Sequence, residues 1–99
     1  MTPEGRVKKE HRDWFDRQGF YHFWPVQTGL GARTVDCLAC VEGYFVAIEI
    51  KRPGIIEPTK LQGLTLQRVG KAGGFAFTSD SLARTKHILA DYLLNFEEK

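Results

Sequence analysis

Two apolar segments joined by the dipeptide Glu42-Gly43 constrain the fold of this chain more than any other feature. The first is TVDCLACV, residues 34–41, and the second is YFVAIEIK, residues 44–51. Their β-branched and aromatic residues favour strands, and a two-residue connection that ends in glycine favours a tight β-hairpin. In such a hairpin Val41 faces Tyr44, and the pairing continues outward from them one residue at a time. A three-residue bulged turn would break this register.

The predicted register places three charged residues on one face of the hairpin. Asp36 lies opposite Glu49 with the two Cβ atoms about 4.5–5.5 Å apart, and Lys51 follows on the same face. Two carboxylates this close repel each other, so the pKa of one rises unless a cation lies between them. Mg²⁺ or Mn²⁺, held by a few carboxylates and by water, is the natural occupant of such a site. Lys51 could then orient a bound water and neutralise developing charge.

A simpler interpretation is that Asp36 lies at a frayed strand end and that Glu49 and Lys51 form a solvated face. The remainder of the hairpin is apolar on both faces, which is typical of strands that are buried on both sides. One face carries Val46, Ile48 and Ile50, and the other carries Leu38, Cys40, Phe45 and Ala47. Charges confined to the far end of such strands favour a site at the rim of the sheet.

Helix start and stop signals divide the rest of the chain. Hydroxyl residues and prolines open the predicted helices, and glycines end them. Before the hairpin we expect a helix from Thr2-Pro3 to Gly19, a strand at Phe20–Val26 and a loop at Gln27–Arg33. After the hairpin we expect a loop at Arg52–Pro58, a helix from Pro58-Thr59 to about Ala72 and a short buried strand at Phe75–Thr78. The last helix is capped by Ser79-Asp80-Ser81, and its apolar stripe consists of Leu82, Leu89, Tyr92, Leu93 and Phe96. This order, αβββαβα, predicts one α/β domain over residues 1–99 with a mixed central sheet flanked by helices.

Composition narrows the function classes. The 99 residues are 42% hydrophobic and 26% charged, and the net charge of +2 is too small to argue for nucleic acid by itself. No apolar run approaches the roughly 18 residues of a membrane helix, and Met1–Gly5 lacks the apolar segment of a signal peptide. The absence of such segments leads us to expect no membrane partner. Two cysteines three residues apart cannot cross-link distant parts of a fold, so we expect a cytoplasmic setting.

Two of the predicted helices each place a polar residue on their inward side. Glu4 aligns with Phe15 on the apolar stripe of the first helix, where it either faces the acidic site or complements the helix dipole. His11 lies on the same stripe and is expected in the core. Gln62 aligns with Leu66 on the second helix, where it is either a satisfied core glutamine or a group that faces the site.

Other chemical motifs are weak. Cys37 and Cys40 form a CxxC, but residues three apart in a strand point to opposite faces and cannot hold one metal together. We interpret both as structural. The glycine-rich stretches GLGAR and GKAGG lack the spacing of a P-loop or of a dinucleotide-binding loop, so no nucleotide cofactor is expected.

Basic side chains near the charged strand ends could contact a polyanion. Arg33 and Arg52 each border such an end, and Lys60 belongs to the same basic set. Most cations of this kind are simply solvated, but those that neutralise phosphates supply much of the affinity of proteins for DNA. Arg33, Arg52 and Lys60 are therefore the candidates for DNA contact.

A helical glutamate, an aspartate and, about a dozen residues later, an E-x-K at the end of the next strand resemble the PD-(D/E)XK nuclease superfamily. EIKRPG (49–54), followed by EPTKLQ (57–62) and a helix that ends at AGG, resembles the virus-type replication-repair nuclease (VRR-NUC) domain. The resemblance spans Glu4 to about Ser79. This family usually has proline before the aspartate, where this chain has Val35, and proline at that position shapes the backbone rather than the chemistry.

The resemblance implies a restriction-endonuclease-like core and a divalent-metal-dependent DNA endonuclease. The metal ligands that it implies are Asp36, Glu49, Glu4 and the main-chain carbonyl of Ile50. The catalytic residues that it implies are Lys51, Asp36, Glu49, Glu4 and Gln62. Stand-alone members resemble phage proteins that form homodimers and cut branched DNA such as Holliday junctions, so we expect both here. Flaps, DNA ends or RNA are alternative substrates, and a silent DNA-binding or assembly protein on the same fold is an alternative function.

Overall fold

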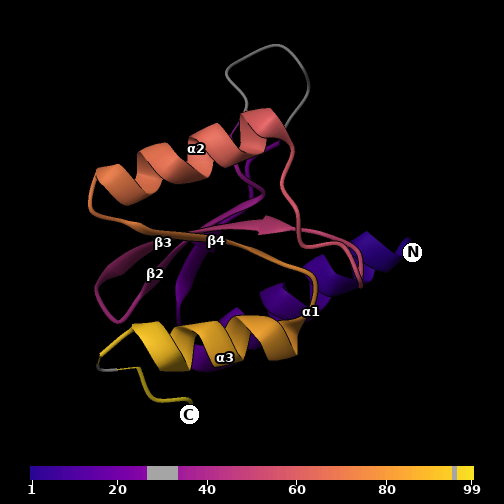
Figure 1. Ribbon diagram of the computed structural model, residues 1–99. Helices are drawn as coiled ribbons and strands as arrows, with labels where there is room; N and C mark the ends of the chain where they lie inside the picture. Colours follow the sequence, from indigo (N-terminus) through magenta and orange to yellow (C-terminus); the bar gives the residue numbers. More distant parts are fainter. Residues whose placement is uncertain (27–33, 95) are drawn as a thin grey trace.

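The computed structural model describes residues 1–26, 34–94 and 96–99, and its elements follow the expected order (Figure 1). They are α1 (Pro3–Gln18), β1 (Tyr21–Phe23), β2 (Cys37–Val41), β3 (Tyr44–Ile50), α2 (Lys60–Lys71), β4 (Phe75–Ser79) and α3 (Leu82–Tyr92). The strands lie in the order β1-β2-β3-β4, with β3 and β4 parallel and the other neighbours antiparallel. The predicted α/β class with a mixed sheet is confirmed.

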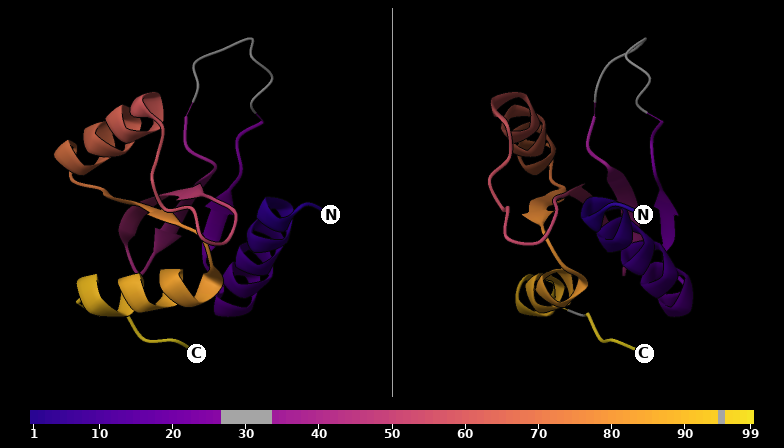
Figure 2. Two further views of the ribbon diagram at one scale, coloured as in Figure 1. Left: turned by 45° about the vertical axis from the view of Figure 1, so that its right-hand side comes forward. Right: turned by 90° about the vertical axis from the view of Figure 1, so that its right-hand side faces the viewer.

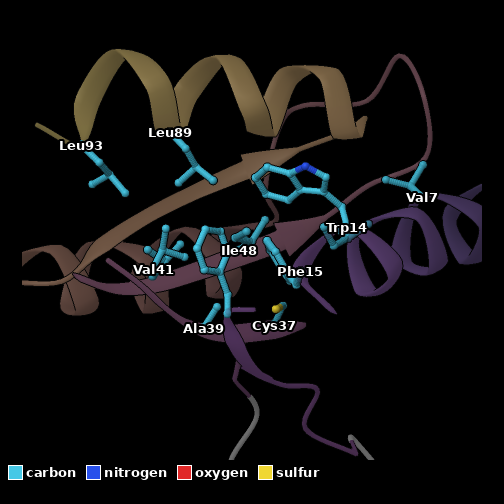
Figure 3. Close-up of a cluster of buried hydrophobic side chains, with 12 residues drawn as sticks. Val7, Trp14, Phe15, Cys37, Ala39, Val41, Ile48, Leu89 and Leu93 are labelled. Atoms are coloured by element: carbon cyan, nitrogen blue, oxygen red, sulfur yellow. The ribbon is translucent and has the colours of Figure 1, made fainter. Parts of the chain in front are cut away.

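The sheet separates two unequal helical layers. One face carries α2, whereas the other carries α1 and α3 (Figures 1 and 2). The core lies on the side of α1 and α3, where Trp14, Phe15 and Leu89 close over Val41 and Ile48 (Figure 3). No residue of α2 is fully buried, so this helix covers its face of the sheet more loosely. Within the described ranges, no helix is both long and apolar enough to span a membrane.

The hairpin between β2 and β3 has the predicted register. Val41 pairs with Tyr44, and Leu38 pairs with Ala47. Glu42 and Gly43 both have positive φ, 51° and 86°. A two-residue turn of this kind matches the right-handed twist of the flanking strands, and glycine adopts the required φ without steric cost. The turn therefore sets which side chains of β3 face α2 and which face the core.

Local caps set the helix ends. The Thr2 hydroxyl accepts a hydrogen bond from the Gly5 amide, and Gly19 ends α1 in the left-handed conformation with φ 79°. At α2, Thr59 and Gln62 form a reciprocal capping box, which starts this helix at Lys60 rather than at Pro58-Thr59.

The first predicted strand, Phe20–Val26, is too long. Only Tyr21–Phe23 pairs with β2, because the Phe20 amide donates to Phe15 O at the end of α1 and the Phe20 side chain packs into the core. The hairpin strands are also shorter than predicted, since β2 begins at Cys37 and β3 ends at Ile50. The predicted loop Gln27–Arg33 lies outside the described residues.

The stripe predicted for the last helix is wrong at Tyr92. Leu89 and Leu93 are buried, but the Tyr92 side chain is 68% exposed and only meets the Phe75 ring, at a centroid distance of 5.7 Å. The helix ends at Tyr92, so Leu93 and Phe96 reach the core from the segment that follows it.

A chain of buried polar groups ties α1, α3 and β4 together. His11 Nδ1 donates to Val7 O at 2.8 Å, and its Nε2 lies 2.6 Å from Thr85 Oγ1, which in turn lies 2.7 Å from Ser79 Oγ. Burial lowers the pKa of His11, which keeps the imidazole neutral in the core. The Ser79 carbonyl accepts from the Lys51 amide at 2.9 Å, so this network also fixes the backbone at the end of β3.

Gly74, where the chain enters β4, provides a test of the packing between α2 and the sheet. A Cβ at this position would lie 2.8 Å from Val69 Cγ1, 3.0 Å from Phe45 Cδ1 and 3.2 Å from Phe45 O. We expect Gly74→Ala to lower the free energy of unfolding by about 1–3 kcal/mol through overpacking, as measured by urea denaturation. At Gly70 a Cβ would meet nothing within 4 Å, so Gly70→Ala in the helix should be neutral or stabilising by up to about 1 kcal/mol. Equal midpoints for the two variants would contradict the close approach at Gly74.

Candidate functional site

Five of the residues singled out in the sequence line one cavity of about 670 Å³ between α2 and the end of the sheet. They are Glu4 from α1, Asp36 from the segment before β2, Glu49 from β3, Lys51 just after β3, and Gln62 from α2. The structure therefore brings together side chains from four different parts of the chain.

Asp36 does not take part in the strand ladder with Glu49 that the sequence predicted, because β2 begins one residue later. Its Oδ2 instead accepts a hydrogen bond from the Ile50 amide at 2.9 Å. Aspartate side chains compete with regular backbone pairing in this way, since a carboxylate oxygen is a strong acceptor for a nearby amide. The bond still holds the carboxylate beside the end of β3.

Glu49 is the most buried acidic group of the site, with 4% of the residue exposed. Its Oε1 accepts from Gln62 Nε2 at 3.0 Å, whereas its Oε2 is buried without a hydrogen-bond partner among the described residues. The pKa of this carboxyl is raised to about 8, first by burial and then by the neighbouring Asp36, through its charge and as an acceptor for a Glu49 proton. Lys51 and Lys8 act in the opposite sense.

Gln62 joins the acidic group to the lysine. Its Oε1 accepts from Lys51 Nζ at 2.7 Å and from the Thr59 amide at 2.8 Å, while its Nε2 donates to Glu49. The side chain therefore faces the cavity and not the core, and the capping box holds it at the start of α2. One glutamine fixes both the ammonium of Lys51 and one oxygen of Glu49.

Lys8, which the sequence pattern did not single out, also lies beside the acidic residues of the site. Its Nζ lies 3.3 Å from Glu4 Oε2 and 3.5 Å from Asp36 Oδ1, so the ammonium stands between two carboxylates. The spacing of Glu4 and Lys8, one turn apart on the same helix face, is the signal that could have placed Lys8 beside the site.

The remaining candidates lie elsewhere. Arg33 falls outside the described residues, and Arg52 and Lys60 are exposed but do not line the cavity. Cys37 is buried and Cys40 is exposed, as expected for opposite faces of one strand. Burial raises the pKa of the Cys37 thiol to about 12, which leaves it unreactive.

The donor set fits a hard divalent cation held by few protein ligands. Among the described residues, no three side chains of the types His, Cys, Asp and Glu form a group that could hold a metal ion. The acidic pair is Asp36 and Glu49, and one buried oxygen of Glu49 has no partner. Leaving such an oxygen unpaired is costly, and Mg²⁺ is commonly bound by one or two carboxylates with water and substrate phosphate completing its shell.

Comparison with known proteins finds a solved structure with a similar fold. No protein-family model and no curated protein matches the chain. A solved structure described as "VRR_NUC domain" superimposes with a TM-score of 0.78, covering 93% of this chain and 99% of that one at 22% sequence identity. The four-stranded mixed sheet with its three helices is thus an α/β fold. More narrowly, the chain has the fold of a VRR_NUC domain, which confirms the resemblance drawn from the sequence at the level of the fold.

Proposed function

We propose that this protein is a Mg²⁺- or Mn²⁺-dependent DNA endonuclease. The observation that carries the proposal is the convergence of Asp36, Glu49, Lys51 and Gln62 in one cavity, with a buried Glu49 oxygen left without a partner. The similarity of the fold to a VRR_NUC domain supports the same conclusion. A structural acidic pair would instead be expected to have both carboxylates fully hydrogen-bonded.

The metal would be held by Asp36, Glu49 and the main-chain carbonyl of Ile50, with Glu4 on the outer side of the site. When bound, such an ion polarises the phosphate and lowers the pKa of a bound water. Lys8, whose ammonium pairs with Glu4 and Asp36, balances part of the acidic charge when no metal is present. With the metal bound, Glu4 would face the hydrated ion in place of the Lys8 ammonium.

Lys51 would position the attacking water and neutralise charge on the phosphate. Gln62 orients the Lys51 ammonium by accepting a hydrogen bond from it, and the Lys51 amide donates to the Ser79 carbonyl. The water gives up one proton to solvent as its oxygen forms a bond to phosphorus, the bond from phosphorus to one sugar oxygen breaks, and the leaving oxygen takes up a proton from solvent. Because the donors are held before substrate arrives, little reorganisation is needed at the moment of reaction.

For the substrate we propose branched DNA, and for the assembly a homodimer. Both rest on the resemblance of the motifs to stand-alone VRR-NUC proteins of phage type. A two-fold dimer presents two copies of the cavity to two strands of a junction. Two free cysteines are compatible with a reducing cytoplasm as the place of action.

The test incubates the protein with a four-way junction, a flap, a linear duplex and a single-stranded RNA, each with Mg²⁺, Mn²⁺ or EDTA. We expect metal-dependent strand cleavage that is fastest on the junction, no cleavage in EDTA, and none by Asp36→Asn, which keeps the shape of the side chain. Sedimentation analysis checks the dimer separately. Equal cleavage of the linear duplex would overturn the branched-DNA assignment, and wild-type cleavage by Asp36→Asn would overturn the enzymatic one.

A further inference from the structure

The cavity of the candidate site continues along α2 into a second cavity of about 670 Å³. Both cavities are lined by Thr34, Thr65 and Arg68, so they adjoin and form one groove between α2 and the sheet, which we call the α2 groove. Figure 1 shows α2 lying across β3 and β4. One end of the groove holds the acidic pair, and the other end reaches Phe45 and Gly74.

Arg68 stands where the two cavities meet. It makes no salt bridge with any residue in the described part of the chain, and it lines both halves of the groove. The first turn of α2 carries no acidic residue, and its last turn carries Arg68 and Lys71. Arginine presents several donors in a planar fork that matches phosphate oxygens, and its position beside the acidic end suits an anion adjacent to the reacting group.

The far half of the groove borders an exposed aromatic surface. Phe45 is 53% exposed and pairs across the sheet with Cys40. Cys40 pairs in turn with Tyr21, which is 75% exposed. Among the described elements, α2 packs against β3 and β4 and leaves this side of β1 and β2 uncovered. Exposed aromatic rings beside a cationic side chain such as Arg68 are an arrangement on which unpaired nucleotide bases stack.

We infer that the α2 groove is a binding subsite for the nucleotide next to the scissile phosphate, with Arg68 on a phosphate and Phe45 stacked on a base. The inference rests on the proposed nuclease function and adds a second contact region to it. Phe45 and Glu49 lie on the same face of β3, four residues and therefore about 13 Å apart. The groove would thus hold a flanking nucleotide while the reacting phosphate lies at the acidic pair.

The first test compares Arg68→Ala with Lys71→Ala, which removes a neighbouring cation that lines neither cavity. Binding of a fluorescent single-stranded oligonucleotide is measured by anisotropy in EDTA over a range of salt concentrations. We expect Arg68→Ala to weaken binding about tenfold and to reduce the slope of log affinity against log salt by about 0.7. Lys71→Ala should keep the wild-type slope. Equal slopes for wild type and Arg68→Ala would overturn the phosphate contact.

The second test moves a single abasic position along the oligonucleotide, with wild type and Phe45→Leu in parallel. Leucine keeps an apolar side chain but has no ring on which a base can stack. Wild type should lose about tenfold in affinity when the stacked base is missing, and Phe45→Leu should be insensitive at every position. A flat wild-type profile would overturn the stacking contact. So would a change of oligomeric state in Phe45→Leu with an unaltered profile, since this face would then be a protein interface.

These measurements can overturn the α2 groove without overturning the proposed nuclease function. If wild type cleaves DNA but Arg68→Ala and Phe45→Leu behave as wild type, only the α2 groove is overturned. If wild type neither binds nor cleaves any of the nucleic acids, the proposed function fails and the groove inference fails with it.

Discussion

Lys51→Met is expected to slow strand cleavage strongly while the protein remains folded and still binds Mg²⁺. The substitution keeps the long apolar stem but removes the ammonium that donates to Gln62 at 2.7 Å. The backbone at this position stays anchored, because the Lys51 amide donates to the Ser79 carbonyl. Loss of a group that positions the water and stabilises charge should slow single-turnover cleavage by about 10²–10⁴-fold.

The measurement pairs cleavage rates with melting curves in the presence and absence of Mg²⁺. Lys51→Met should retain the increase in melting temperature that Mg²⁺ produces, because Asp36 and Glu49 are intact. Lys9→Met is the matched control, since Lys9 is an exposed lysine of α1 that pairs with Asp13 outside the cavity. Cleavage at the wild-type rate by Lys51→Met would show that the ammonium has no catalytic part.

The hairpin could be predicted from the sequence because its determinants are local. Glu42-Gly43 adopts the two positive φ angles that a two-residue turn requires, and this fixes the register outward to Leu38 and Ala47. The caps at Thr2 and Gly19 are local in the same sense, since each involves residues within one turn of a helix. From these signals alone, the charged residues at the far end of the hairpin could be placed on one face.

What the sequence did not reveal depends on contacts between distant segments. Lys8 reaches Asp36 only because α1 packs beside the end of the sheet, and no periodicity in either segment specifies that approach. Gln62 could equally have been a core residue on pattern alone. Gln62 faces the cavity because α2 packs loosely on the sheet, with none of its residues fully buried. The same loose packing leaves Phe45 exposed, although the sequence of β3 is apolar on both faces.

Asp36 shows how a correct site can follow from a partly incorrect local structure. The ladder was expected to extend to an Asp36–Glu49 pair, but the aspartate side chain itself accepts from the Ile50 amide just beyond the start of β2. A side-chain acceptor replaces regular pairing at this point. The carboxylate remains beside Glu49 because Ile50 is the next residue along β3.

Glu49→Gln is expected to stabilise the metal-free protein at alkaline pH. The pKa of the Glu49 carboxyl is raised from 4.5 to about 8, first by burial and then by Asp36. The folded state therefore holds this proton more tightly than the unfolded state. The resulting stability is fully present below about pH 4.5 and is lost as pH rises through about 8. Glutamine cannot lose a proton, so the variant lacks this decline.

The isosteric amide also keeps the local contacts. Its oxygen can accept from Gln62 Nε2 as Glu49 Oε1 does, and its amino group can donate toward Asp36, as a protonated carboxyl would. Above about pH 8 the gap in unfolding free energy between the variant and wild type should be on the order of a few kcal/mol, since each pKa unit corresponds to about 1.4 kcal/mol. Urea denaturation at pH 6 and pH 9 in EDTA measures it. Glu57→Gln, at an exposed loop position outside the cavity, should follow the wild-type profile.

A bound divalent metal ion should reverse the difference in stability between Glu49→Gln and wild type. Binding of a divalent cation requires ionised Glu49, so the Mg²⁺-induced rise in the melting temperature of wild type should increase with pH up to about 8 and then level off. Glu49→Gln should show little or no Mg²⁺ effect at any pH, because the amide offers only a weak neutral ligand in place of the carboxylate. The alkaline stabilisation and the loss of the metal response must appear together, since both follow from one buried carboxylate. Parallel pH profiles for wild type and Glu49→Gln would refute the raised pKa, and an undiminished Mg²⁺ response in the variant would remove Glu49 from the metal site.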